Sequence, residues 1–499
     1  MSIHWPILRK LACHPGRVAV IDDRKTWKSA EILVAAFHIA SEIEKKSTSP
    51  TVATLLPTSG LFPAAALAGW MLGRTVVPLN YLLSPSEIDW ITRHCGADAV
   101  VTVGPILEHL AYEPPVRTIR LDEMSFAGMP EPRVPSRASR DDLAALLYTS
   151  GTSGRPKGVE LTHGNLRSNV RQIDEWVRFE RDDKMLGALP QFHSFGFTVL
   201  TLLPLTIGIP VVYAARFVPT QIVKRLRDHR PTFFVALPSM YNALTTVKSA
   251  TAEDFASLRY IVSGGEPLPD SVFQTYQERF NKTINEGYGL TETAPVSNWC
   301  RPADFRRRSV GRAIPDVEIA IVDVESGREL PAGMDGEVRI GGPNVTRGYY
   351  REPGLSDAMH DEKGRLRTGD IGRLDPDGHL YITGRHKEML IIAGENVFPR
   401  EIEEVLNQHP SVQASGVVGL KDDMRGEIAV AVVELVEGEA FDEDALRRWC
   451  RETIGAARTP RHIAMLSELP KGPTGKIQRR ELKRMIDAGE LVLGAGAGA

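Results

Sequence analysis

A stretch rich in glycine, serine and threonine covers residues 148–158 and reads YTSGTSGRPKG. It follows an apolar run, residues 143–147, and is therefore predicted where a strand ends and the chain turns. Glycines let backbone N–H groups approach a ligand closely, and hydroxyl groups add further partners for phosphate oxygens. A flexible polar linker would not need the Pro-Lys-Gly sequence with which this stretch ends, so we interpret the stretch as a phosphate loop. The residues expected to contact phosphate are Thr149, Ser150, Gly151, Thr152, Ser153, Gly154 and Lys157.

This phosphate loop differs from the P-loop of other nucleotide-binding proteins. The P-loop places glycine before its lysine and serine or threonine after it. Here Pro156 precedes Lys157 and Gly158 follows it. The sequence therefore predicts a phosphate site of another kind.

Two further glycine-rich motifs are expected at the carboxyl ends of strands. Residues 263–267 close the apolar run 260–262, and residues 286–292 are predicted to follow the next strand. Open α/β sheets bind ligands at these strand ends, so the two motifs suit the floor of a nucleotide site. Tyr288 by itself could also be a core aromatic residue. The candidate residues are Gly264, Gly265, Glu266, Glu286, Gly287, Tyr288, Gly289, Thr291 and Glu292.

Charged groups with a possible role in chemistry also occur in the last third of the chain. Asp370 ends a Thr-Gly-Asp sequence, and Arg385 follows Gly384. A short carboxylate is the expected partner of ribose hydroxyls, although Asp370 alone could equally be a turn residue. Residues 470–480 form a Gly/Pro-rich loop that carries several cations, among them Lys476. On its own this loop would be a solvated basic turn.

The elements expected to position these residues alternate between strands and helices, which favours an α/β fold with parallel sheets. From about residue 317 short strands separated by Gly and Asp turns predict a smaller antiparallel region. After Gly384 a new alternation of strands and helices begins, and the remaining stretch of about 115 residues is long enough for a separate domain. Helices are expected near residues 26–44, 221–229, 240–247, 399–407 and 442–452. Strands are expected near residues 52–56, 75–79, 232–237, 260–262, 318–324, 337–340, 379–383, 389–392, 414–418 and 428–435.

Composition limits the possible classes of protein. The chain has 499 residues, 42% hydrophobic and 25% charged, as expected for a soluble globular protein of two to four domains. A formal net charge of −3 gives no positive field that would recruit nucleic acid. The four cysteines lack metal-ligand spacing, and we find no signal peptide pattern, so a reducing, cytoplasmic location is expected. The apolar residues 199–215 contain prolines and fall short of a membrane span, so we expect them in the core.

Together the motifs resemble those of the adenylate-forming enzymes, which include acyl-CoA synthetases, coumarate ligases, firefly luciferase and the adenylation domains of peptide synthetases. The resemblance extends from Thr26-Trp27 and residues 76–80 to the segment around Lys476, with the motifs in the family's order. It is strongest to fatty acyl-CoA synthetases. It implies an N-terminal AMP-binding domain, residues 1–386, and a mobile α+β lid domain, residues 387–490. The alternating Gly and Ala residues at the end of the sequence predict a flexible tail, residues 491–499.

The resemblance also implies roles for the nucleotide motifs, with ATP and Mg²⁺ as ligands. Residues 264–266 and 286–289 would hold adenine, and Thr291 would lie near the α-phosphate. Thr152 and Glu292 would hold magnesium. Asp370 and Arg385 would bind the ribose.

Further roles follow from the resemblance for the lid domain and the acyl pocket. Lys476 would be catalytic, bridging the substrate carboxylate and the α-phosphate. Lys387 would be the hinge about which the lid domain rotates between two half-reactions, and Gly394 would leave room for the pantetheine arm of coenzyme A. His193 would lie beside the acyl pocket and stabilise the bound carboxylate, although a lone histidine beside aromatic residues is more often structural.

The sequence also bears on the substrate and the acceptor. Residues 191–197 contain no aspartate that would pair with an amino acid's ammonium group, and they are rich in phenylalanine. We therefore expect a fatty acid as substrate. The resemblance to acyl-CoA synthetases implies coenzyme A as acceptor, and a monomer or homodimer is expected. An aryl acid, an acyl carrier protein as acceptor, and a non-catalytic binder of acyl groups or nucleotide remain open. The phenylalanines and leucines expected to accommodate the acyl tail are Phe192, Phe195, Phe197, Leu200, Leu202 and Leu203.

Overall fold

The computed structural model describes residues 2–150, 155–392, 395–422, 426–456, 458–471, 477–491 and 493. The chain divides into two compact units, which are described separately. The first comprises Met1–Gly265, Arg279–Ile319 and Arg339–Arg367. The second comprises Glu266–Glu278, Ala320–Val338 and Thr368–Ala499.

One sheet of the first unit carries the phosphate loop. Its five strands from β6 to β7 run parallel, and β8 pairs antiparallel with β7 at the edge. Every residue of β3 is buried, as expected for a parallel strand covered on both faces. The strand order is β6 (Arg117–Arg120), β5 (Ala99–Thr102), β3 (Thr51–Leu55), β4 (Thr75–Pro78), β7 (Leu143–Ser150) and β8 (Pro156–Thr162).

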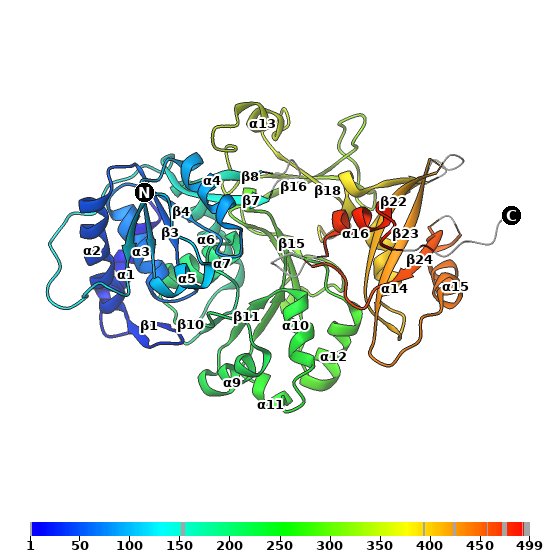
Figure 1. Ribbon diagram of the computed structural model, residues 1–499, viewed down its shortest axis with the longest axis horizontal. Coiled ribbons are helices and arrows are strands. Elements are labelled where there is room, and N and C mark those ends of the chain that lie inside the picture. Colours follow the sequence, from blue (N-terminus) through cyan, green and yellow to red (C-terminus); the bar gives the residue numbers. More distant parts are fainter. Residues whose placement is uncertain are drawn as a thin grey trace. The chain divides into compact units, whose positions relative to one another are not determined.

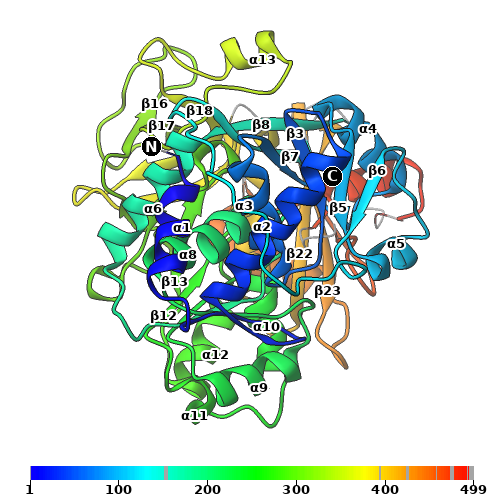
Figure 2. The ribbon, with the colours of Figure 1, turned by 90° about the vertical axis from the view of Figure 1, so that its left-hand side faces the viewer.

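Helix α3 (Leu61–Met71) is buried along its whole length and lies beside β3 and β4 (Figure 1). A Cβ atom at Gly69 would lie within 3 Å of Val52 and Val76, so this glycine allows the helix to approach the strands closely. Helix α2 (Ser29–Lys46) packs on α3 and on α1 (His4–Cys13), and Figure 2 shows α1 and α2 side by side. One part of the core of this unit therefore lies between this sheet and these helices.

A second, nine-stranded sheet of the first unit carries the nucleotide motifs. Its strands from β13 to β1 run parallel, with antiparallel strands at both edges. Helices α9 (Pro219–His229), α10 (Pro238–Thr245) and α11 (Ala252–Phe255) lie together beside β11 (Figure 1). The order is β15 (Arg312–Ala313), β14 (Val296–Trp299), β13 (Asn285–Gly289), β12 (Tyr260–Ser263), β11 (Phe233–Ala236), β9 (Met185–Gly187), β10 (Val211–Tyr213), β1 (Val18–Ile21) and β2 (Thr26–Lys28).

The apolar residues 199–215 lie in the core of this unit, as predicted. They form most of η1 (Thr198–Leu202), then α8 (Leu203–Ile207) and β10, and most of their side chains are buried. Among the described residues, no helix is both long and apolar enough to cross a membrane. The remaining helices up to residue 358 are α4 (Pro85–Cys95), α5 (Gly104–Leu110), α6 (His163–Val177), α7 (Ser194–Phe197), α12 (Asp270–Phe280), α13 (Pro353–Ala358) and the short η2 (Thr291–Thr293) and η3 (Pro302–Asp304).

A small four-stranded sheet has the order β16 (Glu318–Val322), β17 (Gly336–Gly341), β18 (Leu366–Leu374) and β19 (Leu380–Arg385). Strands β18 and β19 pair antiparallel. The short strands predicted from about residue 317 therefore belong to a separate small sheet.

The last part of the second unit is a five-stranded sheet covered by helices on both faces. Alternate residues of β23 (Gly426–Leu435) point to opposite faces: Ala429, Ala431 and Val433 lie in one apolar cluster, and Val430 and Val432 in another. The first cluster includes side chains of α14 (Pro399–Leu406) and α15 (Glu443–Ile454), and the second includes Leu482 of α16 (Arg479–Asp487). The other strands are β20 (Leu390–Ile392), β21 (Glu395–Val397), β22 (Val412–Asp422) and β24 (His462–Met465), and η4 (His386–Glu388) precedes them.

Candidate functional site

The described residues at the two ends of the phosphate loop belong to the paired strands β7 and β8, which together form the phosphate hairpin. Tyr148 pairs with Gly158, Thr149 with Lys157, and Ser150 with Pro156 across β7 and β8. The sequence predicted that the strand ends at Leu147, and this was wrong: β7 continues to Ser150 because pairing with β8 extends it beyond its apolar part. Four of the predicted phosphate contacts, Gly151, Thr152, Ser153 and Gly154, lie outside the described residues, and so does the side chain of Ser150.

An aromatic cluster supports the base of this hairpin. The Tyr148 hydroxyl lies 2.7 Å from His94 Nδ1, and Trp90 stacks on the His94 ring. A Cβ atom at Gly158 would lie 3.0 Å from the Tyr148 ring, so the absence of a side chain there makes room for the tyrosine. Burial raises the pKa of Tyr148, and its hydroxyl therefore stays neutral at physiological pH.

Residues 346–351 run alongside the hairpin and also contact the turn that carries Glu292. Tyr349 forms an antiparallel bridge with Val159, and the Tyr350 N–H donates to the Gly158 carbonyl at 2.8 Å. The Thr346 N–H donates to the Glu292 carbonyl at 2.7 Å. This segment therefore joins the phosphate hairpin to η2.

Tyr349 brings two predicted ATP-site residues together. Its hydroxyl donates to Glu292 Oε1 at 2.7 Å, and Lys157 Nζ lies 5.5 Å from the centre of its ring. Burial and the nearby Glu292 carboxylate raise the pKa of Tyr349, so it acts as a neutral donor. Sequence reasoning missed Tyr349, for which the only cue was a pair of tyrosines in a loop.

The carboxylate of Glu292 fits the magnesium predicted there, because carboxylate oxygens are preferred ligands of this ion. In the part of the chain that the structure describes, Oε2 of Glu292 has no hydrogen-bond partner, while Oε1 is held by Tyr349. No group of three or more His, Cys, Asp or Glu side chains that could hold a metal occurs among the described residues. Glu292 would therefore share the ion with phosphate oxygens, as magnesium commonly does in nucleotide sites.

The second nucleotide motif forms a strand itself. Residues 285–289 are β13, which pairs with β12 on one side and β14 on the other, so the prediction that the motif follows a strand was wrong. The sequence did not predict this strand because it consists largely of glycine and polar residues and lacks the apolar alternation typical of strands. Glu286 forms an ion pair with Arg307 at 2.8 Å, and the Thr291 hydroxyl donates to Ser194 at 3.1 Å.

The first nucleotide motif follows β12, as predicted. Gly264 lies against the ring of Phe195: a Cβ atom at Gly264 would lie 3.1 Å from that ring. Gly265 adopts a positive φ of 85°, which favours glycine. Glu266 belongs to the second unit.

His193 is exposed just before α7, and its Nδ1 atom accepts a hydrogen bond from the Phe195 N–H at 3.4 Å. Most of the apolar residues that follow are core residues and do not face an open pocket. Phe197 is fully buried and meets Phe62 and Trp70 edge to face. Leu200, Leu202 and Leu203 belong to the same core.

The second unit holds the predicted ribose residues. Asp370 and Arg385 are register partners on β18 and β19, and their side chains form an ion pair of 2.8 Å. Lys387 lies in η4, directly after β19. Gly394 and Lys476 lie outside the described residues.

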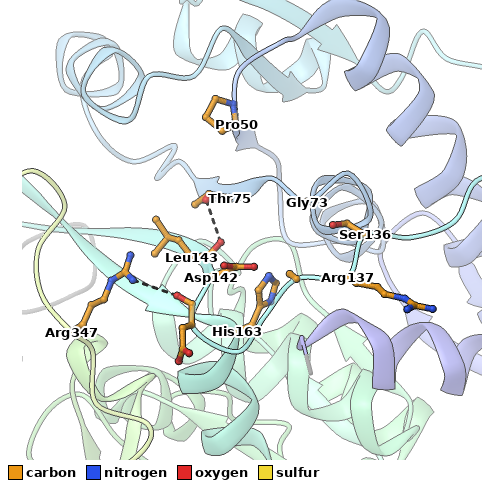
Figure 3. Close-up of a pocket in the computed structure, with 11 residues that line it drawn as sticks. Pro50, Gly73, Thr75, Ser136, Arg137, Asp142, Leu143, His163 and Arg347 are labelled. Atoms are coloured by element: carbon orange, nitrogen blue, oxygen red, sulfur yellow. Dashed lines mark hydrogen bonds between the residues drawn. The ribbon is translucent and has the colours of Figure 1, made fainter.

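A cavity of about 330 Å³ lies at the amino end of β7, away from the phosphate loop (Figure 3). His163 and Asp142 face one another in it, and Arg347 donates to the Asp141 carbonyl at 3.3 Å. Burial lowers the pKa of His163 to about 4. None of the residues predicted to bind ATP lines this cavity.

Comparison with protein families gives two matches in tandem. The family described as AMP-binding enzyme matches residues 8–350, and the AMP-binding enzyme C-terminal domain matches residues 401–476. The chain belongs to the AMP-binding enzymes. The resemblance inferred from the motifs is thus confirmed.

Individual relatives support this assignment over nearly the whole length of this AMP-binding enzyme. A feruloyl-CoA synthase from Amycolatopsis is 30% identical over 96% of the chain and 98% of its own length. The ATP-bound structure of MatB from Rhodopseudomonas palustris has a TM-score of 0.89 at 28% identity, covering 98% of this chain and 100% of that one. O-succinylbenzoate coenzyme A synthetase from Bacillus subtilis, in complex with ATP and magnesium, has a TM-score of 0.85 at 28% identity, covering 96% and 99%.

These matches confirm the predicted fold class of this AMP-binding enzyme, its parallel-sheet N-terminal region and smaller C-terminal domain. The prediction of an AMP-forming CoA ligase that uses ATP, Mg²⁺ and coenzyme A is confirmed at the level of the family. The domain boundary at residue 387 and the roles of individual site residues stay predictions.

Proposed function

We propose that this enzyme activates a carboxylic acid in two steps. The acid's carboxylate attacks the α-phosphorus of ATP, pyrophosphate leaves, and an acyl-adenylate forms. The thiol of coenzyme A then attacks the acyl carbon, and AMP leaves as the thioester forms. The observation that carries the proposal is the convergence of Lys157, Tyr349 and Glu292 beside the phosphate hairpin.

The first step brings a carboxylate to a triphosphate, so like charges must be offset. Lys157 supplies a cation beside the hairpin, and Glu292 would hold a magnesium ion that withdraws charge from the phosphate oxygens. Asp370 and Arg385 would orient the ribose. Lys476 would bridge the attacking carboxylate and the α-phosphate.

For the acid, we propose an apolar body with no ammonium group. A fatty acid is the first candidate, supported by the absence of aspartate from residues 191–197. An aryl acid is the second, supported by the similarity to feruloyl-CoA synthase and by the core position of Phe197, Leu200, Leu202 and Leu203, which leaves them unavailable to line an alkyl channel. The half-buried Phe195, lying against Gly264, is an apolar surface that suits either body.

The acceptor is proposed to be free coenzyme A, with an acyl carrier protein as the alternative, because both present the same pantetheine thiol. A cytoplasmic location and a monomeric or dimeric state also remain predictions.

The deciding experiment is acid-dependent exchange of labelled pyrophosphate into ATP. Short, medium and long fatty acids are compared with benzoate and cinnamate derivatives. We expect exchange with fatty acids, whereas exchange with aryl acids alone would replace the first candidate by the second. A lack of exchange with every acid would contradict the proposed activation step.

Two further comparisons test the role of Lys476 and the identity of the acceptor. Lys476→Ala should lose exchange, whereas Lys483→Ala, which removes an exposed lysine of α16, should retain it. Thioester formation is then measured with coenzyme A and with acyl carrier protein. Transfer to the carrier protein alone would overturn the proposed acceptor.

A further inference from the structure

Tyr349 lies between two groups that the proposed function assigns to ATP and magnesium. Its hydroxyl donates to one oxygen of Glu292 at 2.7 Å, and its ring lies 5.5 Å from the ammonium nitrogen of Lys157. One side chain thus contacts both the predicted metal ligand and the predicted phosphate cation. Nothing in the motifs of the sequence assigned it a role.

The backbone holds this tyrosine in place from several directions. Tyr349 bridges Val159 of β8, and its N–H donates to the Ser356 hydroxyl at 2.9 Å. Three residues earlier, the Thr346 N–H donates to the backbone carbonyl of Glu292. The phenol and the carboxylate therefore belong to one hydrogen-bonded framework, and their contact does not depend on a freely moving loop.

The hydrogen bond acts on one oxygen of the carboxylate. The hydrogen bond to Oε1 restrains the rotation of the Glu292 carboxylate, and Oε2 has no hydrogen-bond partner among the described residues. Groups that hydrogen-bond a metal ligand from behind commonly set its orientation, and their loss weakens metal binding. The aromatic ring acts separately, since its face attracts the Lys157 cation.

We infer that Tyr349 is a positioning residue of the ATP–magnesium site: its hydroxyl orients Glu292 for the metal, and its ring holds Lys157 beside the phosphate hairpin. This inference rests on the proposed function only in the roles of Glu292 and Lys157 as ligands of magnesium and phosphate.

The test is binding of a non-hydrolysable ATP analogue by the full-length protein, measured calorimetrically with EDTA and across a Mg²⁺ titration. Tyr349→Phe removes the hydroxyl and keeps the ring, whereas Tyr349→Leu removes both. Tyr350→Phe is the matched control, because the Tyr350 hydroxyl has no hydrogen-bond partner within the described part of the chain. Thermal unfolding of each variant reports whether it folds.

In Tyr349→Phe we expect Mg²⁺ to increase the affinity for the ATP analogue about 10-fold less than in the unaltered protein. The affinity measured with EDTA should be unchanged. Tyr349→Leu should weaken metal-free binding as well, because Lys157 loses its aromatic contact. Tyr350→Phe should match the unaltered protein. If Tyr349→Leu fails to fold, the comparison of the two phenylalanine variants still decides.

An unchanged Mg²⁺ dependence in Tyr349→Phe would overturn the inference. Equal weakening with and without Mg²⁺ would also overturn it, because that result indicates a general structural defect. These readouts do not require catalysis. A failure of pyrophosphate exchange with every acid, alongside the expected binding data, would therefore contradict the proposed function and support the role of Tyr349.

Discussion

Asp370 and Arg385 face each other on neighbouring strands, with Arg385 Nε 2.8 Å from Asp370 Oδ1. The aspartate side chain is only 4% exposed and the arginine side chain 58% exposed, so the pair joins a buried carboxylate to a cation at the surface. The two residues predicted to bind ribose are thus positioned by a single strand pairing.

The first prediction concerns this pair. Asp370→Asn keeps the shape of the side chain and removes its charge, and hydrogen bonds to charged groups contribute about 1.5–3 kcal/mol. We expect the KM for ATP to rise about 10-fold or more, with the KM for the acid unchanged, in steady-state kinetics. Arg373→Ala is the control, because Arg373 on the same strand pairs with the exposed Asp335. An equal rise in both KM values would argue against a ribose contact.

The second prediction separates the two half-reactions. Lys476→Ala should abolish formation of acyl-adenylate, since the cation that offsets charge at the α-phosphate is gone. The same variant should still convert supplied acyl-adenylate to thioester. Both reactions are followed by chromatography of AMP, acyl-adenylate and thioester, with Lys483→Ala as control. Equal loss of both steps would be inconsistent with a lysine that serves adenylation alone.

Parts of this site could be read from residues alone, because they depend on residue type. The glycines and hydroxyls of residues 149–157 and the carboxylates of Glu292 and Asp370 carry their chemistry in the sequence. Partners distant in sequence could not be predicted. Tyr349 and Glu292 are 57 residues apart, and nothing local indicates that η2 and the 346–351 segment meet.

The fold was predicted best where apolar periodicity is strong. Residues 221–229 were expected to be helical and lie in α9, and residues 232–237 were expected to be a strand and contain β11. Polar strands were missed for a physical reason. Residues 286–289 of β13 are held by backbone pairing between β12 and β14, and their side chains show no apolar alternation.

The third prediction is a loss of stability in mild acid. The pKa of His163 falls from 6.5 to about 4 in the folded protein because the ring is buried, with His4 adding to the lowering and Asp142 opposing it. The unfolded chain therefore binds more protons between these values, and stability decreases as pH falls from about 6.5 to 4. The maximal contribution is about 3 kcal/mol. Burial also lowers the pKa of His4, which acts in the same direction.

Urea unfolding between pH 7 and pH 4 measures this effect. His163→Asn retains an acceptor for the Ile3 N–H, which now donates to His163 Nδ1, and should make the pH dependence shallower. His109→Asn alters an exposed histidine and should leave the dependence unchanged. A slope identical to that of the unaltered protein in His163→Asn would rule out His163 as a source of acid sensitivity.

The fourth prediction compares two glycines of one strand. A Cβ atom at Gly289 would lie 1.8 Å from the Pro295 carbonyl oxygen, whereas one at Gly287 would have its nearest neighbour at 3.4 Å. Gly289→Ala should therefore destabilise the protein by about 1–3 kcal/mol or more through backbone displacement. Gly287→Ala should unfold close to the unaltered midpoint in calorimetry. Similar midpoints for both variants would show that the backbone at Pro295 can shift with little loss of stability.

The position of residues 346–351 along the chain has a consequence for folding during synthesis. Glu160 and Arg347, which form an ion pair, are 187 residues apart. While the chain emerges from the ribosome, β7 and β8 become available long before the segment that bridges them to η2. Domains tend to fold as units, and contacts of long sequence separation form late. Nascent chains that stop before residue 346 should therefore lack a complete ATP site, and nucleotide would stabilise this region only late in translation.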